Sequence, residues 1–132
     1  MEYACRGETT TAFSFGENIT TNQVNYNGDH PNKGGAKGAY RGKTLEVNAV
    51  KTGNGFGLYQ MHGNVNEWCF DWEADYPAGS VTDPIGPESG SSRVIRGGGW
   101  NNGARLCRSA NRSSHSPEDR YYDVGFRVAV GR

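Results

Sequence analysis

The sequence has no excess of charge of either sign and no long hydrophobic run. Its 132 residues carry 14 Lys and Arg against 14 Asp and Glu. A basic surface field of the kind that attracts nucleic acid or an anionic membrane is therefore not expected. No apolar run approaches the roughly 20 residues that a helix needs to cross a bilayer. We therefore expect neither a nucleic acid nor a membrane as a partner.

Cysteine is scarce, and the number of cysteines is odd. The three cysteines stand at positions 5, 69 and 107, and this spacing does not resemble a disulfide framework. We therefore predict three mostly buried thiols in a reducing compartment. A cytoplasmic protein of bacterial origin fits this expectation best.

Helical periodicity is also scarce, whereas glycine and aromatic residues are abundant. The chain contains 20 Gly, 3 Trp, 7 Tyr and 5 Phe. Disordered chains are poor in aromatic residues, so this content argues against disorder. The composition predicts a modest core of a few large rings beneath long loops. The length allows one domain at most.

The pattern predicts short elements between these loops. Phe13 and Phe15 alternate with a serine, which suits a half-buried strand, and Phe126, Val128 and Val130 are expected to share one face of another. In chain order we expect the end of a helix over residues 1–6 with Gly7 as its stop, a strand over 12–16, a loop over 18–42, a strand over 43–50, a loop over 74–92, a strand over 93–96 and a last strand over 124–130.

The densest run of large apolar residues covers residues 57–72. Oxygen-bearing side chains lie between the apolar ones, and Gly63 permits a positive φ. Such a segment can fold around a hard cation such as Ca²⁺. Local chemistry favours the alternative of a buried turn that leads into a core strand, and a short helix over 65–70 is also open. The apolar side chains expected to face inward are Leu58, Met61, Val65, Trp68 and Phe70.

Four motifs follow one another along the chain. They are Glu2-Tyr-Ala-Cys-Arg-Gly7, Gly57-Leu-Tyr-Gln-Met-His-Gly-Asn-Val-Asn-Glu-Trp68, Arg93-Val-Ile-Arg-Gly-Gly-Gly-Trp100 with Cys107-Arg-Ser-Ala-Asn-Arg112 behind it, and Val124-Gly-Phe-Arg127. Together they resemble the formylglycine-generating enzyme (sulfatase-modifying factor) family. The resemblance implies a loop-rich, C-type lectin-like α+β fold with short antiparallel strands and little helix. It also implies a single but partial domain over residues 1–132, because family domains usually have a further stretch before the first motif.

The resemblance implies a structural calcium ion at the second motif. Gln60 stands where family members often have Asp or Asn, so we expect a weaker site, since Ca²⁺ also accepts amide oxygens. Asn64 is expected to hold the loop backbone instead of the ion. A further calcium near Asn25 stays open beside an ordinary Asn-Gly turn. The implied ligands are the side-chain oxygen of Gln60, the backbone carbonyls of Gly63 and Val65, and the carboxylate of Glu67.

The resemblance also raises the question of copper. The family's enzymes oxidise a substrate cysteine with Cu(I) held by two cysteines, and Cu(I) requires soft thiolates. In this chain Asn101 and Asn102 stand near the first of these positions, and only Cys107 lies near the second. We therefore expect no copper site and interpret Cys107 as a small buried residue. This weighs against enzymatic activity.

The segment between Trp100 and Phe126 mixes Tyr, Asn, Ser, Arg and His. Adaptable binding loops have this composition, and an ordinary solvated loop is the alternative. The segment resembles the variable region of proteins made by diversity-generating retroelements, which reuse this fold. The candidate ligand-binding residues are Trp100, Asn101, Asn102, Arg105, Ser113, His115, Tyr121 and Tyr122.

Three functions stay open at this point. The sequence favours a non-catalytic module that binds an unknown protein or small ligand and is stabilised by calcium. The second is an oxidase that converts a sulfatase cysteine to formylglycine, and the third is a structural remnant of a larger enzyme. Self-association or completion by another chain is expected with a partial domain, because apolar surface would otherwise be exposed.

Overall fold

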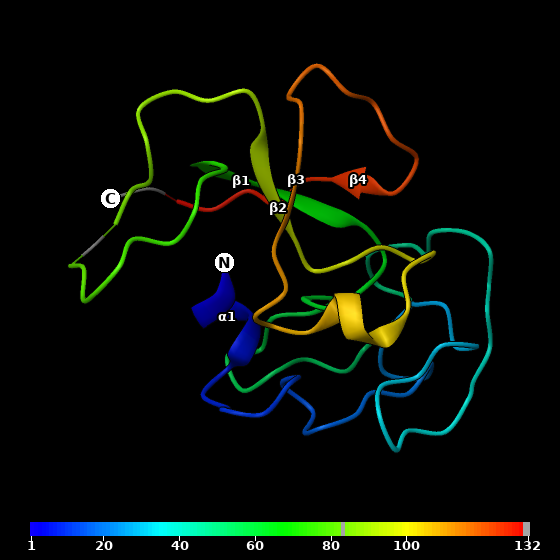
Figure 1. The fold of residues 1–132 in the computed structure, drawn as a ribbon. Helices are drawn as coiled ribbons and strands as arrows, with labels where there is room; N and C mark the ends of the chain where they lie inside the picture. Colours follow the sequence, from blue (N-terminus) through cyan, green and yellow to red (C-terminus); the bar gives the residue numbers. More distant parts are fainter. Residues whose placement is uncertain (83, 131–132) are drawn as a thin grey trace.

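The computed structural model describes residues 1–82 and 84–130, most of which lie outside helices and strands (Figure 1). No helix among these residues is long and apolar enough to cross a membrane. The elements are the helix α1 (Glu2–Arg6), the strands β1 (Asn66–Trp72) and β2 (Arg93–Arg96), the 3-10 helix η1 (Ala104–Cys107), and the strands β3 (Ser113–His115) and β4 (Val124–Gly125).

The four strands form one sheet in the order β3-β2-β1-β4. Strand β2 pairs antiparallel with both β1 and β3. Strand β4 lies parallel to β1, with Asn66 opposite Val124 and Glu67 opposite Gly125. The expectation of antiparallel strands is therefore wrong for β4. After β3 the chain crosses to the far edge of the sheet and meets β1 there in the same direction (Figure 1).

The central turn (residues 60–65) leads directly into β1. This outcome confirms a turn followed by a strand and rules out a helix over 65–70. The expectation that Phe70 faces inward is wrong, because its ring is exposed. The pairing of β1 with β2 is irregular between Trp68 and Trp72. In this bulged stretch the Arg93 guanidinium lies 3.6 Å from the centre of the Trp72 ring and 5.5 Å from that of Phe70.

The predicted strand over residues 12–16 is a tight turn. Phe13 and Gly16 exchange two backbone hydrogen bonds of 3.0 and 3.1 Å. Because the chain reverses between them, Phe13 and Phe15 both pack against the same core. The buried members of that core are Phe13, Ile19, Val24, Tyr26, Ala104 and Cys107.

The predicted strand over residues 43–50 is also wrong, because this stretch is a loop. The side chain of Asn64 accepts a hydrogen bond from the Leu45 amide (2.8 Å) and donates one to the Leu45 carbonyl (3.1 Å). An amide side chain offers the same donor and acceptor as a neighbouring strand. The loop is therefore fixed in place without belonging to a sheet.

The last predicted strand ends early. Strand β4 stops at Gly125, and the side chains of Phe126, Val128 and Val130 are exposed. Only Val124 and Gly125 pair with β1, opposite Asn66 and Glu67. The alternation of apolar residues is present in this segment, but within the described residues no strand neighbour buries it.

Other expectations are confirmed. Helix α1 ends at Gly7, which has a left-handed conformation with φ 54°, and β2 forms over residues 93–96. The described parts of the loops over 18–42 and 74–92 contain no helix or regular strand and lie on opposite sides of the molecule (Figure 1). All three cysteines are free, with Cys5 and Cys107 buried and Cys69 half-buried.

His62 in the central turn joins two distant segments. Its Nδ1 lies 2.7 Å from the Cys107 carbonyl, and its Nε2 lies 3.1 Å from the Ser14 amide nitrogen. A carbonyl only accepts and an amide N–H only donates, so Nδ1 carries the proton and the ring is neutral. Burial lowers the pKa of His62, although the bond to the Cys107 carbonyl partly opposes this shift.

We predict that acid weakens the fold through His62. Because its pKa in the folded state lies below the ordinary 6.5, protons bind preferentially to the unfolded chain as the pH falls below 6.5. The stability that the neutral His62 ring contributes above pH 6.5 is then lost. The free energy of unfolding, measured with urea at about pH 7.5 and about pH 5.5, should therefore decrease more on acidification for the wild type than for His62→Gln. Equal drops in the two proteins would contradict this assignment.

Candidate functional site

The central turn contains three residues with positive φ, namely Gln60 (51°), Gly63 (71°) and Asn64 (65°). A Cβ added at Gly63 would lie 2.4 Å from the carbonyl oxygen of Asn25. This close approach allows the Asn64 amide to donate to the same carbonyl (2.8 Å) and the Gly63 amide to donate to Gly97 (2.8 Å). Only glycine fits at position 63.

The structure brings the four predicted calcium ligands together. They line one pocket of about 370 Å³, which also touches Phe126 and Arg127 from the segment after β4. Four residues of one short stretch therefore line the same space. The ligands in question are Gln60, Gly63, Val65 and Glu67.

Gln60 fits the role of a cation ligand. Its Nε2 donates to the carbonyls of Glu46 (3.0 Å) and Val47 (2.8 Å), which fixes the orientation of the amide. The oxygen Oε1 is buried and has no hydrogen-bond partner among the described residues. A buried oxygen without a partner is costly, and a hard cation such as Ca²⁺ would satisfy it.

Glu67 is the only acidic member of this set. It is 7% exposed, and its carboxylate pairs with Arg127 through Nη2 at 2.9 Å. The Gly63 carbonyl accepts the Val65 amide (2.9 Å), which leaves one of its lone pairs free. The set therefore contains only oxygen donors with a single negative charge. No group of three or more His, Cys, Asp or Glu side chains that could hold a metal occurs in the described part of the chain.

Asn64 holds the backbone of its surroundings, as expected from the sequence. Besides its two bonds to Leu45, its Oδ1 accepts from Asn25 Nδ2 at 3.0 Å. Both ends of the Asn64 amide are therefore used within the protein. The Oδ1 of Asn25 is buried without a partner in the described residues, and a second calcium near Asn25 stays an open prediction.

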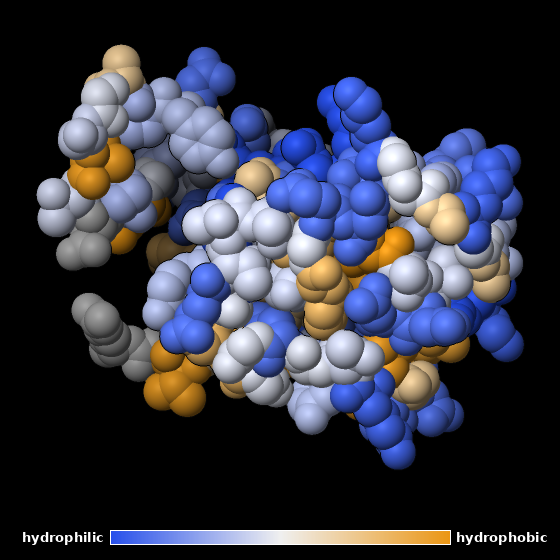
Figure 2. All heavy atoms as spheres, turned by 90° about the horizontal axis from the view of Figure 1, so that it is seen from below, coloured by the Kyte–Doolittle hydropathy of each residue, from blue (hydrophilic) through white to orange (hydrophobic). Residues whose placement is uncertain are grey.

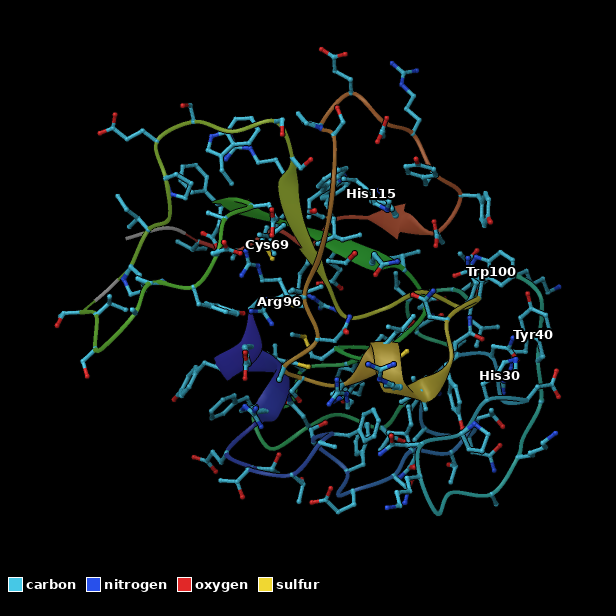
Figure 3. All side chains as sticks on the ribbon, viewed as in Figure 1. His30, Tyr40, Cys69, Arg96, Trp100 and His115 are labelled. Atoms are coloured by element: carbon cyan, nitrogen blue, oxygen red, sulfur yellow. The ribbon has the colours of Figure 1, made fainter. Side chains whose placement is uncertain are left out.

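Aromatic rings from three loops meet at Trp100. The Tyr40 ring is stacked on Trp100 with centres 6.0 Å apart, and the Tyr122 ring lies 5.7 Å away. Figure 3 shows Tyr40 beside Trp100, far from Cys69. The sequence interpretation missed Tyr40, because no local pattern links it to a residue 60 positions later. The loops meet because the Asn27 amide donates to the Asn102 carbonyl (2.9 Å).

The other candidate ligand-binding residues are more scattered. His115 and Tyr121 form a second aromatic pair with ring centres 4.4 Å apart. Asn102 accepts the Gly99 amide through Oδ1 (2.9 Å), so it fixes its own turn. The remaining candidates are Asn101, whose Oδ1 is buried without a partner in the described residues, Arg105, exposed on η1, and Ser113, exposed at the start of β3.

Cys107 lies inside the core, as predicted. It is fully buried, and burial raises the pKa of its thiol to about 12. Burial likewise raises the pKa of Cys5 to about 11. Metal binding and nucleophilic attack by cysteine require the thiolate. At neutral pH both groups are thiols in this environment.

Comparison with known proteins gives a consistent assignment. Residues 1–132 match the family model described as sulfatase-modifying factor enzyme 1-like domain. The formylglycine-generating enzyme of Bos taurus is 34% identical over 138 residues, which cover 98% of this chain and 36% of that protein. The chain thus spans about a third of the length of the curated relatives that it matches first.

Two solved structures share the fold. Treponema denticola variable protein 1 superposes with a TM-score of 0.74 and 36% identity, over 95% of this chain and 42% of that one. PvdO from Pseudomonas aeruginosa gives a TM-score of 0.74 and 29% identity, over 95% of this chain and 47% of that one. The loop-rich, C-type lectin-like α+β fold expected from the sequence is confirmed.

We predict that Gly63→Ala destabilises the protein far more than Gly57→Ala. Both glycines have φ near 70°, but a Cβ at Gly57 would meet nothing within 4 Å. Gly57→Ala should therefore cost about 1 kcal/mol of backbone strain, whereas Gly63→Ala adds a backbone collision and should cost about 3 kcal/mol or more. Chemical denaturation of the two variants measures both costs. Similar losses would show that the close approach to Asn25 is not needed.

Proposed function

Because the chain belongs to the family of sulfatase-modifying factor enzyme 1-like domains, we propose that it is a non-catalytic, calcium-stabilised binding module of that family. Its binding surface lies in the segment between Trp100 and Phe126. The observation that supports this proposal most is the convergence of Tyr40, Trp100 and Tyr122 from three separate loops.

The aromatic rings have the properties of a recognition surface. Tyr40 and Tyr122 are exposed, and Trp100 is half-buried between them. Such rings supply a large contact area with polar tips at a low cost in conformational entropy. The turn beneath Trp100 is fixed by the bonds of Asn102, so the surface is largely formed before a partner binds.

The partner in this proposal is a protein or a small ligand. The balanced charge gives no support for nucleic acid or an anionic membrane. The loop over residues 117–122 is exposed along its whole length, so its side chains could change without disturbing the core. This is the kind of surface that a diversity-generating retroelement would vary, and one structural neighbour is named a variable protein.

Calcium has a structural role in this proposal. Gln60, Gly63, Val65 and Glu67 would hold the ion and fix the turn that supports β1. The buried, unpartnered oxygen of Gln60 supports the assignment. The proposed setting is the cytoplasm of a bacterium, and the three free thiols support its reducing character.

Completion by another chain, or self-association, is a second candidate that a specific observation supports. A hollow of about 870 Å³ lies between α1, β1 and the segment after β4. Its lining includes Tyr3, Phe70 and Val128, which are all exposed. Figure 2 shows other hydrophobic side chains, in orange, at the surface among hydrophilic ones. An exposed apolar surface of this kind often marks an interface, and a remnant of a larger enzyme would share this property.

The oxidase alternative has less support. It requires two cysteine ligands for copper. Asn101 and Asn102 stand near the position of the first copper cysteine, and only Cys107 lies near the second. Copper-dependent oxidation of a cysteine-containing peptide by the purified chain would contradict the non-catalytic proposal.

We predict that Ca²⁺ raises the melting temperature relative to a chelator. An ion that binds only the folded state stabilises it, and a hundredfold excess over Kd should raise Tm by about 10 °C for a domain of this size. Gln60→Asp adds a negative charge and should increase the response, whereas Gln60→Leu removes the oxygen and should reduce it. A sharp transition in the wild type with the same melting temperature in Ca²⁺ and in chelator would refute the calcium assignment.

We predict that Tyr122→Ala weakens partner binding, whereas Tyr76→Ala does not. The two tyrosines are similarly exposed, at 72% and 70%, but of the two only Tyr122 contacts Trp100. Loss of one aromatic contact residue should reduce the recovered partner about tenfold. Affinity capture with the wild type and both variants, quantified by mass spectrometry, measures the effect. Equal recovery with Tyr122→Ala, or equal losses in both variants, would exclude this surface.

A further inference from the structure

Arg127 binds the carboxylate that the proposed calcium site needs. Its Nε lies 3.2 and 3.1 Å from the two carboxylate oxygens of Glu67, and its Nη2 lies 2.9 Å from one of them. The Nη2 group also donates to the carbonyls of Tyr59 (2.9 Å) and Gln60 (3.4 Å). The guanidinium therefore lies beside the pocket that the calcium ligands line.

A buried carboxylate requires a compensating positive charge. Arg127 supplies this charge to Glu67 through a fork of hydrogen bonds that reaches both oxygens. A second cation on the same carboxylate would lie a few ångströms from the guanidinium. Like charges at that separation repel strongly where water is partly excluded. The two cations therefore compete for Glu67.

We propose that the Arg127 guanidinium neutralises the Glu67 carboxylate when Ca²⁺ is absent, and that its hydrogen bonds to Glu67 weaken when Ca²⁺ binds. This inference rests on the calcium site proposed above. It adds that the calcium affinity of the chain is set partly by Arg127, and that the site is coupled to the segment over residues 126–130.

The coupling follows from how this segment is held. Strand β4 ends at Gly125, and among the described residues all side-chain hydrogen bonds from 126–130 to the rest of the protein come from Arg127. Apolar burial contributes little, because Phe126 and Val128 are 77% and 82% exposed. Loss of the Arg127 contacts therefore frees the segment. By reciprocity, a partner that fixes Arg127 on Glu67 lowers the affinity for Ca²⁺.

Calcium titration of Arg127→Gln tests the competition. The variant removes the charge but keeps a hydrogen-bonding side chain, and calorimetry should show Ca²⁺ binding about tenfold tighter than in the wild type. Arg108→Gln is the matched control, because among the described residues Arg108 Nε donates only to the carbonyl of Arg105 within its own turn (2.9 Å). That variant should bind Ca²⁺ as the wild type does.

The outcomes separate the two proposals. Binding of Ca²⁺ with equal affinity in all three proteins would overturn the role of Arg127 and leave the calcium site standing. Weaker binding by Arg127→Gln would overturn it too, because Arg127 would then help to build the site. Absence of binding in all three would overturn the calcium site together with this inference.

A second measurement needs no variant. Hydrogen exchange of a peptide over residues 124–130 in the wild type should become faster when Ca²⁺ replaces the chelator, because release of the segment weakens the adjoining pairing of Val124 and Gly125 with β1. A control peptide over β2 (Arg93–Arg96) should not become faster. Unchanged or slower exchange of the 124–130 peptide with Ca²⁺ bound would refute the coupling.

Discussion

Buried polar groups in the central turn hold this loop-rich chain in one conformation. The buried core is small, and most of the chain runs through loops that make few apolar contacts. Asn64 satisfies both backbone groups of Leu45, and His62 connects Ser14 with Cys107. Leaving such buried groups unpaired costs more than a hydrogen bond gains. The segments that contain Ser14, Leu45 and Cys107 are therefore each held to this turn.

The same constraint positions both candidate sites. The Asn64 carbonyl accepts the Trp100 amide (2.9 Å), so the aromatic surface is attached to the turn that forms the oxygen-lined pocket. Glu67, in the strand that follows the turn, forms an ion pair with Arg127 and thereby holds the segment after β4. A cation in the pocket would therefore affect the central turn, which supports both the proposed binding surface and the segment after β4.

The sequence predicted features that depend on local chemistry, but not those in which a residue distant in the sequence determines the conformation. The family motifs predicted the fold, α1 and β2, and placed four candidate ligands that line one pocket. The alternating pattern over residues 43–50 predicted a strand, because a pattern does not reveal that an amide side chain takes the place of a strand neighbour. The pattern over 124–130 similarly does not reveal that only Val124 and Gly125 pair with β1. Tyr40 was missed, since only the folded loops bring it to Trp100.

Native-state hydrogen exchange of the Ser14 and Leu45 amides tests most directly whether the central turn holds the loops. Both amides lie outside strands and donate to side chains of this turn, to His62 Nε2 (3.1 Å) and Asn64 Oδ1 (2.8 Å). We predict that they exchange as slowly as the paired amides of β1 and β2, through global unfolding. Exchange at the fast rate of exposed loop amides would contradict it, because the loops would then open independently of the turn.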